Sequence, residues 1–199
     1  MSDSLNNSPN PFSYWVVQGK LLAGEYPGNQ FSWNPAIFCA SVVHTVRALI
    51  ATNFRFWNTT GSKVSSLIDA GVGTIVDLTE EHERSDYVDR LYFEGNLRCT
   101  SIKYRRFAIA DRSVPSKKIM EEILDFIETE IMEGRLVYLH CFRGLGRTGT
   151  VVGCYLVRNG VERCRITSVI SDLRKGVAGD FRKSPENDFQ MSFIDNWSR

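Results

Sequence analysis

One ten-residue segment of the 199-residue chain holds residues whose types and spacing could do chemistry. It runs from His140 to Gly149 and contains Cys141, then five residues with two glycines, and then Arg147. Glycines allow consecutive backbone N–H groups to turn inward and bind an anion. Arg147 adds a planar fork that matches two oxygens of a phosphate. The segment therefore predicts a thiolate nucleophile lying beneath a bound phosphate.

The elements expected on either side of this segment would strengthen the same site. Residues 136–139 are apolar without alternation, which is typical of a strand covered on both faces. Residues 148–157 are almost all apolar or small and predict a buried helix. The first turn of that helix would present unpaired N–H groups and the positive end of its dipole to the anion. A strand, an anion-binding loop and a helix are thus expected in this order.

The segment resembles the signature H-C-x5-R-[ST]-G of the cysteine-dependent protein tyrosine phosphatases. It is most similar to the dual-specificity branch, in particular to its small atypical and bacterial-type members. The resemblance implies that Cys141 is the nucleophile and that Arg147 and the loop between them bind the phosphate. The loop residues are Phe142, Arg143, Gly144, Leu145 and Gly146.

The resemblance also implies roles for His140, which precedes Cys141, and for Thr148, which follows Arg147. The hydroxyl of Thr148 is expected to hydrogen-bond the sulfur of Cys141 and to help it leave when water cleaves the phosphocysteine. An ordinary threonine of a first helical turn is the alternative. His140 is expected to be buried, where it holds the loop and favours the thiolate rather than transferring protons.

A candidate general acid lies 30 residues before Cys141, between a predicted strand and a predicted helix. Transfer of a phosphoryl group from an ester needs a proton for the leaving oxygen, and a carboxyl group can supply it. In dual-specificity phosphatases the acid occurs in a pattern similar to F-x-I-x-D-x-x-x-P. Phe107, Ile109, Asp111 and Pro115 match its fixed positions, so Asp111 is predicted to be the acid. A turn or helix-cap residue is the alternative.

A further candidate lies near the C-terminus. Residues 184–190 resemble the segment S-P-E-x-x-x-Q of bacterial relatives. Gln190 is therefore predicted to orient the hydrolytic water or to support the phosphate loop. The alternative is an ordinary helix start with Ser184 as its cap.

Other functions are compatible with parts of the same pattern. Residues 144–149 also fit G-x-G-x-x-G, the dinucleotide fingerprint, but only about 50 residues follow, and these predict helices rather than the strands of a Rossmann half. No Gly-Lys-Ser/Thr follows, which excludes a P-loop NTPase. Arsenate reduction or sulfur transfer, and a module that binds phosphorylated partners without turnover, remain alternatives. The low-molecular-weight-type reductases, however, have their cysteine loop at the N-terminus.

The whole chain predicts one α/β domain with a central, mostly parallel sheet flanked by helices, similar to the dual-specificity phosphatases. Residues 1–13 are expected to be a disordered lead-in, residues 14–199 the phosphatase domain, and residues 29–61 an insertion atypical of the family. The expected strands are 14–17, 21–24, 74–78, 100–104 and 136–139. The expected helices are 35–51, 62–70, 84–93, 116–132, 148–157, 164–174 and 185–196.

Composition limits the surroundings in which such a domain would act. Lys and Arg number 24 against 23 Asp and Glu, which argues against a dedicated nucleic-acid binder. The five cysteines lack C-x-x-C spacing and the N-terminus lacks a secretory layout, so free thiols in the cytoplasm are expected. The longest apolar stretch, 35–51, contains His44 and Arg47 and is too short to span a membrane.

These observations predict a metal-independent phosphoester hydrolase of the protein tyrosine or dual-specificity type, acting as a monomer without a cofactor. The loop and Arg147 would supply the positive field that magnesium provides in other phosphoryl-transfer enzymes. The expected substrate is a phosphorylated protein or peptide carrying phosphotyrosine, with phosphoserine and phosphothreonine open. Phosphoinositides and RNA 5′-phosphates remain alternatives, although the loop lacks the lysines of inositol-lipid phosphatases.

Overall fold

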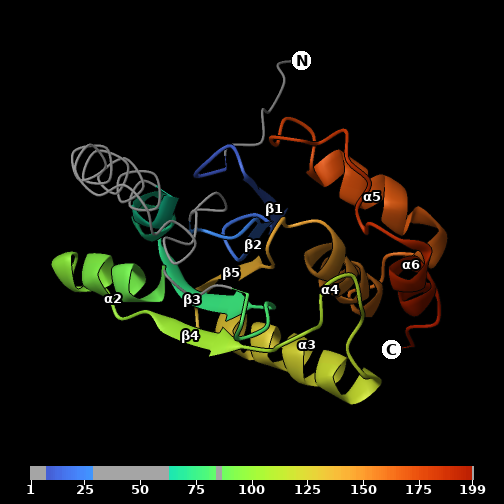
Figure 1. Cartoon of the computed structure of the whole chain (residues 1–199), viewed down its shortest axis with the longest axis horizontal. Coiled ribbons are helices and arrows are strands. Elements are labelled where there is room, and N and C mark those ends of the chain that lie inside the picture. The colour runs from blue at the N-terminus through green and yellow to red at the C-terminus, as the bar shows by residue number, and fades with distance from the viewer. Residues whose placement is uncertain (1–7, 29–62, 84–86, 199) are drawn as a thin grey trace, which may run out of the picture.

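The computed structural model describes residues 8–28, 63–83 and 87–198. Its centre is a five-stranded sheet with the order β1-β2-β5-β3-β4 (Figure 1). The strands are β1 (Ser13–Val17), β2 (Leu21–Gly24), β3 (Val72–Asp77), β4 (Lys103–Arg106) and β5 (Leu136–His140). β1 pairs antiparallel with β2, and the other three pairings are parallel. The predicted α/β fold with a mostly parallel sheet is therefore confirmed.

Helices cover both faces of this sheet. The described helices are a segment at 63–69, α2 (Val88–Leu97), α3 (Lys117–Met132), α4 (Gly146–Arg158), η2 (Arg163–Arg165), α5 (Ile166–Leu173) and α6 (Asp188–Asp195). The helices α3, α4, α5 and α6 lie on one side, and α2 lies on the other with the 63–69 segment (Figure 1). No helix in the described part of the chain is long and apolar enough to cross a membrane.

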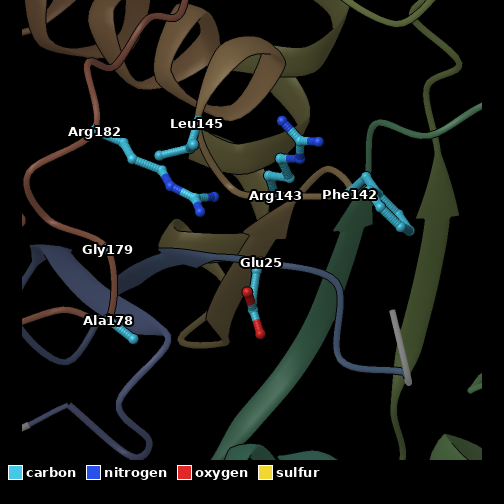
Figure 2. A pocket seen from close by; sticks show the side chains of 7 residues that line it. All are labelled: Glu25, Phe142, Arg143, Leu145, Ala178, Gly179 and Arg182. Carbon is cyan, nitrogen blue, oxygen red and sulfur yellow. The ribbon is translucent and has the colours of Figure 1, made fainter. Parts of the chain in front are cut away.

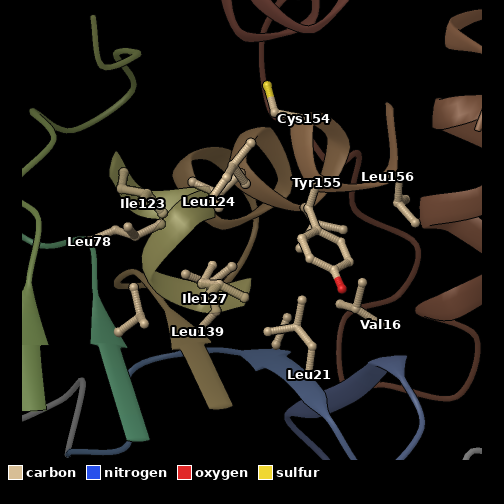
Figure 3. Packing of buried hydrophobic residues seen from close by; sticks show 14 of the residues in the cluster. Val16, Leu21, Leu78, Ile123, Leu124, Ile127, Leu139, Cys154, Tyr155 and Leu156 are labelled. Carbon is tan, nitrogen blue, oxygen red and sulfur yellow. The ribbon is translucent and has the colours of Figure 1, made fainter. Parts of the chain in front are cut away.

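The central position of β5 explains why its sequence does not alternate. Side chains of a strand point to opposite faces in turn, and both faces of this sheet are covered. Val137 and Leu139 belong to the core cluster formed with α3 and α4, whereas Tyr138 belongs to the cluster formed with α2 and the 63–69 segment. Figure 3 shows Leu139 beside Ile127 in the first of these clusters.

Small residues allow α4 to be buried between the sheet and other helices. Every residue from Gly146 to Val157 is buried, as the sequence predicts. A Cβ atom at Gly153 would lie 2.4 Å from Cδ1 of Ile194 in α6, which is far inside van der Waals contact. The close approach of α6 to α4 therefore depends on this glycine.

Several boundaries differ from the sequence prediction. α2 spans Val88–Leu97 rather than 84–93, and β4 spans Lys103–Arg106 rather than 100–104. α6 begins at Asp188, because the side chain of Asn187 caps it by accepting from the N–H of Gln190. Ser184, the alternative cap, instead donates its hydroxyl to the carbonyl of Leu145 at 2.8 Å.

Some expected segments lie outside the described residues. These are residues 1–7 of the lead-in and the whole insertion at 29–61, with its predicted helix at 35–51. The end of the lead-in contacts the domain, since the carbonyl of Pro11 accepts from the N–H of Ala178 at 2.7 Å and that of Phe12 accepts from Glu25 at 3.2 Å.

Candidate active site

Cys141 lies at the carboxyl end of the central strand. It follows β5 directly and is 3% exposed. The nucleophile loop, defined here as residues 141–146, then leads into α4. Gly144 within it has φ +67°, and a Cβ atom there would lie 2.5 Å from backbone atoms of Gly24. Backbone conformation and close packing on the end of β2 therefore both require glycine at 144.

The start of α4 brings a second predicted residue to this loop. Thr148 is fully buried, and its hydroxyl has no hydrogen-bond partner among the described residues. Buried hydroxyls are normally hydrogen-bonded, because desolvation without a partner is costly. The predicted bond to the sulfur of Cys141 would satisfy this group and stays a prediction.

Arg147 is the charged centre of the site and is only 2% exposed. Its Nη1 donates to the carbonyl of Ile109 at 3.0 Å, and its two Nη groups form a bidentate ion pair with Glu83, with Nη2 2.8 Å from Oε2. Burial lowers the pKa of Arg147, but the hydrogen bonds and charge of Glu83, together with the electrostatic effects of Cys141 and Asp111, outweigh burial and hold the pKa above its usual value. The guanidinium is therefore a fixed positive charge.

The predicted acid meets this arginine. The acid loop, defined here as residues 107–116, connects β4 to α3 and carries Asp111, whose side chain is 65% exposed. Oδ1 of Asp111 accepts a hydrogen bond from Nη2 of Arg147 at 3.1 Å. Asp111 and Arg147 are 36 residues apart in sequence, and the structure brings them together.

The acid loop is also held from the side of α6. The side-chain amide of Asn187 donates to the carbonyl of Arg112 at 2.9 Å, and that of Gln190 donates to the carbonyl of Ser113 at 3.3 Å. The Oε1 atom of Gln190 accepts from the N–H of Glu186 at 3.1 Å. Both polar atoms of the Gln190 amide thus bond backbone groups, and one of them bonds the acid loop.

His140 is fully buried beneath the nucleophile loop. Its Nε2 lies 2.7 Å from the hydroxyl of Tyr87, and its Nδ1 lies 3.2 Å from the carbonyl oxygen of Cys141. Burial lowers the pKa of His140 and outweighs the opposing effect of the nearby Asp77 carboxylate. A neutral imidazole therefore contacts both Tyr87 and the backbone of the nucleophile loop. The burial of His140 is as predicted, and its role in holding the loop and favouring the thiolate stays a prediction.

The part of the chain that carries this site matches a known protein family. A family model described as "Polymorphic toxin system, DSP-PTPase phosphatase" matches residues 51–161, which is more than half of the chain and includes Asp111, Cys141 and Arg147. The chain belongs to this family. The predicted membership in the dual-specificity branch of the cysteine-dependent phosphatases is thereby confirmed.

Individual phosphatases are similar to parts of the chain. A tyrosine-protein phosphatase of Autographa californica nuclear polyhedrosis virus is 34% identical over 88 residues, 43% of this chain and 48% of that protein. The phosphatidylglycerophosphate phosphatase PTPMT1 of Arabidopsis thaliana is 28% identical over 136 residues, 62% of this chain and 39% of that protein. The chain thus spans about half or less of the length of the curated relatives it matches.

A solved structure supports the fold over nearly the whole chain. The active form of Tk-PTP superposes with a TM-score of 0.64 at 20% identity and covers 94% of this chain and 96% of its own. At this identity the likeness shows the phosphatase fold alone.

Two residues that contact Arg147 or the acid loop, Glu83 and Asn187, are not among the residues predicted from the sequence. Glu83 follows β3 in an acidic run, and the carboxyl ends of neighbouring parallel strands meet at one edge of a sheet. That run after a predicted strand is the signal that could have found it. Asn187 carried no such signal, because its contact with Arg112 joins residues 75 positions apart.

A cleft of about 370 Å³ opens beside the nucleophile loop (Figure 2). Phe142, Arg143 and Leu145 line it from the loop, and Glu25 lines it from the end of β2. The opposite wall is the segment that carries Arg182. Of the predicted loop residues, Phe142, Arg143 and Leu145 therefore line this cleft, whereas Gly144 and Gly146 are buried.

Proposed function

We propose that the chain is a metal-independent phosphomonoester hydrolase that uses Cys141 as nucleophile and acts on phosphotyrosine in a protein or peptide. The observation that carries this proposal is the convergence of Arg147 and Asp111, 3.1 Å apart, at the loop that begins with Cys141. A phosphate bound in that loop would have a nucleophile, a fixed cation and a proton donor within reach.

The first step transfers the phosphoryl group to sulfur. The thiolate of Cys141 attacks phosphorus in line with the ester oxygen, so that the S–P bond forms as the P–O bond breaks. Arg147 and the backbone N–H groups of residues 142–147 bind the other phosphate oxygens, where charge accumulates. Protonated Asp111 gives its proton to the departing oxygen.

The second step returns the enzyme to its starting state. Asp111, now a carboxylate, accepts a proton from the water that attacks phosphorus and breaks the S–P bond. The hydroxyl of Thr148 donates to the departing sulfur, which is the partner its buried oxygen lacks. His140 holds the loop, and Gln190 supports the acid loop through Ser113.

Substrate binding must replace one contact of the free enzyme. Asp111 occupies an Nη2 hydrogen of Arg147, and a phosphate oxygen needs that same donor. Entry of the phosphate therefore displaces the side chain of Asp111, which is 65% exposed and can move to the leaving-group side, where it acts in its protonated form. Glu83 stays paired and keeps the guanidinium in place.

Turnover of p-nitrophenyl phosphate in the presence of EDTA tests this function. We expect the wild type to turn over and Cys141→Ser to be inactive while still binding vanadate. A module that only binds phosphorylated partners would show no turnover in the wild type. Turnover abolished by EDTA would contradict the metal-independent mechanism.

A phospholipid phosphate is the second candidate substrate. The Arabidopsis relative named a phosphatidylglycerophosphate phosphatase matches 62% of this chain, a longer part than the viral tyrosine phosphatase matches. A substrate panel separates the candidates: phosphotyrosine and phosphoserine or phosphothreonine peptides, phosphatidylglycerophosphate, phosphoinositides and 5′-phosphorylated RNA. The phosphotyrosine peptide should give the highest kcat/KM.

We also propose that the protein is a cytoplasmic monomer. The described cysteines, Cys99, Cys141, Cys154 and Cys164, are free thiols, which suits a reducing compartment. Light scattering and subcellular fractionation would test the two statements separately.

A further inference from the structure

We propose that Arg106, the last residue of β4, is a positioning residue of the active site. By balancing the buried carboxylate of Asp77, it keeps His140 in the uncharged form that contacts the nucleophile loop. The inference rests on the proposed function and deepens it, because it names a residue that acts on the loop of Cys141 through another side chain.

The contacts of His140 determine which ring nitrogen carries hydrogen. Nδ1 lies 3.2 Å from the carbonyl oxygen of Cys141, and a carbonyl can only accept, so the hydrogen is on Nδ1. A neutral ring then has a bare Nε2, which accepts from the hydroxyl of Tyr87 at 2.7 Å. A charged ring carries hydrogen on both nitrogens and accepts from neither. The hydrogen bond from Tyr87 therefore depends on an uncharged imidazole.

A carboxylate close to His140 works against this uncharged state. Oδ1 of Asp77 lies 3.9 Å from Nε2 of His140, and both side chains are fully buried. Little solvent screens a charge in such a place, so a buried carboxylate favours the protonated form of a neighbouring base. Without compensation, Asp77 would therefore draw a proton to His140.

Arg106 supplies the compensating charge. Its Nη2 and Nε atoms lie 3.2 Å and 3.4 Å from Oδ2 of Asp77. In residues 8–28, 63–83 and 87–198, it is the one lysine or arginine that forms an ion pair with this carboxylate. The other hydrogen-bond donors to Asp77 are the N–H and hydroxyl of Thr79 and the hydroxyl of Tyr104, which are neutral. The charge of Asp77 is therefore balanced by Arg106.

The aromatic groups around His140 are neutral as well. Tyrosine hydroxyls ionise only near about pH 10. Burial raises the pKa of Tyr87 and of Tyr138 well above the usual value. Burial also raises the pKa of Tyr104, which donates to Asp77 from β4. The rings that face the imidazole are those of Tyr26, Tyr87 and Tyr138.

The charged groups around His140 have opposing effects on its pKa. Burial has the largest effect and lowers this pKa. The charge of Asp77 and the hydrogen bond to the carbonyl of Cys141 raise it, whereas the charges of Arg106 and Arg147 lower it. Arg147 makes no ion pair with Asp77 among the described residues. Removal of Arg106 would thus leave an unbalanced carboxylate beside a ring that can take a proton.

NMR of the imidazole nitrogens tests the protonation state directly. The chain has three histidines, and the variants His44→Gln and His82→Gln assign the remaining signals to His140. In the wild type we expect His140 to stay neutral, with hydrogen on Nδ1, between about pH 5 and 8. In Arg106→Gln the amide can still donate to Asp77 but carries no charge. We expect His140 of this variant to be mostly protonated at about pH 6.

Turnover of p-nitrophenyl phosphate gives a second readout. Arg106→Gln should be about tenfold slower than the wild type at about pH 6, because a charged His140 no longer accepts from Tyr87 and the loop shifts. The deficit should shrink as pH rises and the ring loses its proton. The double variant Asp77→Asn/Arg106→Gln, which has neither charge, should keep His140 neutral and recover the wild-type pH profile. A role in packing alone would not be rescued by a second loss.

Arg135→Gln is the matched control. Arg135 forms an ion pair with Glu130, which is fully buried as Asp77 is, but it precedes β5 at the end away from His140. Its replacement should lower the melting temperature and leave the nitrogen signals of His140 and the shape of the pH profile unchanged.

Several results would overturn the role of Arg106. These are a neutral His140 in Arg106→Gln, a proton taken up by Asp77 instead, a charged His140 in the double variant, or the same change in Arg135→Gln. The expected NMR signals in a wild type without turnover would instead contradict the proposed function and leave the effect of Arg106 on His140 intact.

Discussion

The nucleophile loop and the acid loop meet at one site, yet they are held in different ways. The nucleophile loop lies between a strand bonded on both sides and a helix whose residues are buried from Gly146 to Val157. The acid loop exposes Asp111, and its position depends on hydrogen bonds from Arg147, Asn187 and Gln190. Packing fixes the whole of the first loop. The second is packed into the core at Phe107 and Ile109, but its part around Asp111 is held by a few polar contacts.

This difference matches the work that each loop would do. Binding of phosphate oxygens needs donors that are in place before the substrate arrives, because reorganisation would consume binding energy. As the proposed acid, Asp111 would have to leave Arg147 and reach the leaving oxygen, so an exposed side chain on the polar part of its loop is suited to this role. Variants of the two loops should therefore differ in how strongly their defects depend on the leaving group.

The largest effect should come from Asp111→Asn. Turnover of a phosphotyrosine peptide should fall by roughly 10²–10⁴-fold, the usual contribution of acid–base catalysis. The defect should be much smaller for an aryl phosphate with a very acidic phenol, which departs without a proton. Vanadate should bind as tightly as in the wild type or more tightly, because Arg147 loses a competing carboxylate.

An ordinary turn residue would behave differently. Its replacement would lower the melting temperature and reduce turnover of both substrates alike. Equal defects of Asp111→Asn on the two substrates would therefore assign the acid role elsewhere.

An intermediate effect is expected for Asn187→Asp, which separates two roles of one side chain. The new carboxylate keeps the acceptor that caps α6 but lacks the donor to the carbonyl of Arg112. The acid loop should shift while the helix stays capped. We expect turnover of the phosphotyrosine peptide to fall about tenfold, with little change for the activated aryl phosphate and a constant melting temperature.

Asn196→Asp provides the control at the other end of the same helix. There the amide donates to the carbonyl of Ser192 and makes no hydrogen bond to the described residues of the acid loop. It should leave the ratio of the two substrates unchanged. A uniform loss in Asn187→Asp would show that α6 does not position Asp111.

The same contrast explains how much the sequence could predict. The nucleophile loop was predictable because its strand, glycines, arginine and helix are contiguous, and the helix and strand types follow from local apolar patterns. The start of α6 was missed by three residues, since Asn187 rather than Ser184 caps it. Contacts such as Asn187 with Arg112 join distant segments, and only the folded topology brings them together.

Glu83 is paired with the buried Arg147 at the start of α4, next to the packed nucleophile loop. Of the variants considered, its replacement should have the smallest effect. Glu83→Gln replaces a carboxylate in the bidentate pair with Arg147 by a neutral amide. The loss should be about 1 kcal/mol at neutral pH, or about 2–4 °C in melting temperature for a chain of this size. Glu133→Gln, which removes a carboxylate from an exposed pair with Arg135, should cost less.

The pH dependence of that difference identifies its origin. Partial burial raises the pKa of Glu83, but the hydrogen bonds and charge of Arg147, together with the hydrogen bond from the N–H of Glu80, outweigh burial and hold the pKa below its usual value. As pH falls, the unfolded chain therefore binds the proton first, at about pH 4.3. The stabilisation is fully present above that value and is lost as pH falls through the lower pKa of the folded state. Thermal melts should thus show the gap between wild type and Glu83→Gln closing below about pH 4. A gap that stays constant into that range would mean that Glu83 acts through packing, and not through its charge on Arg147.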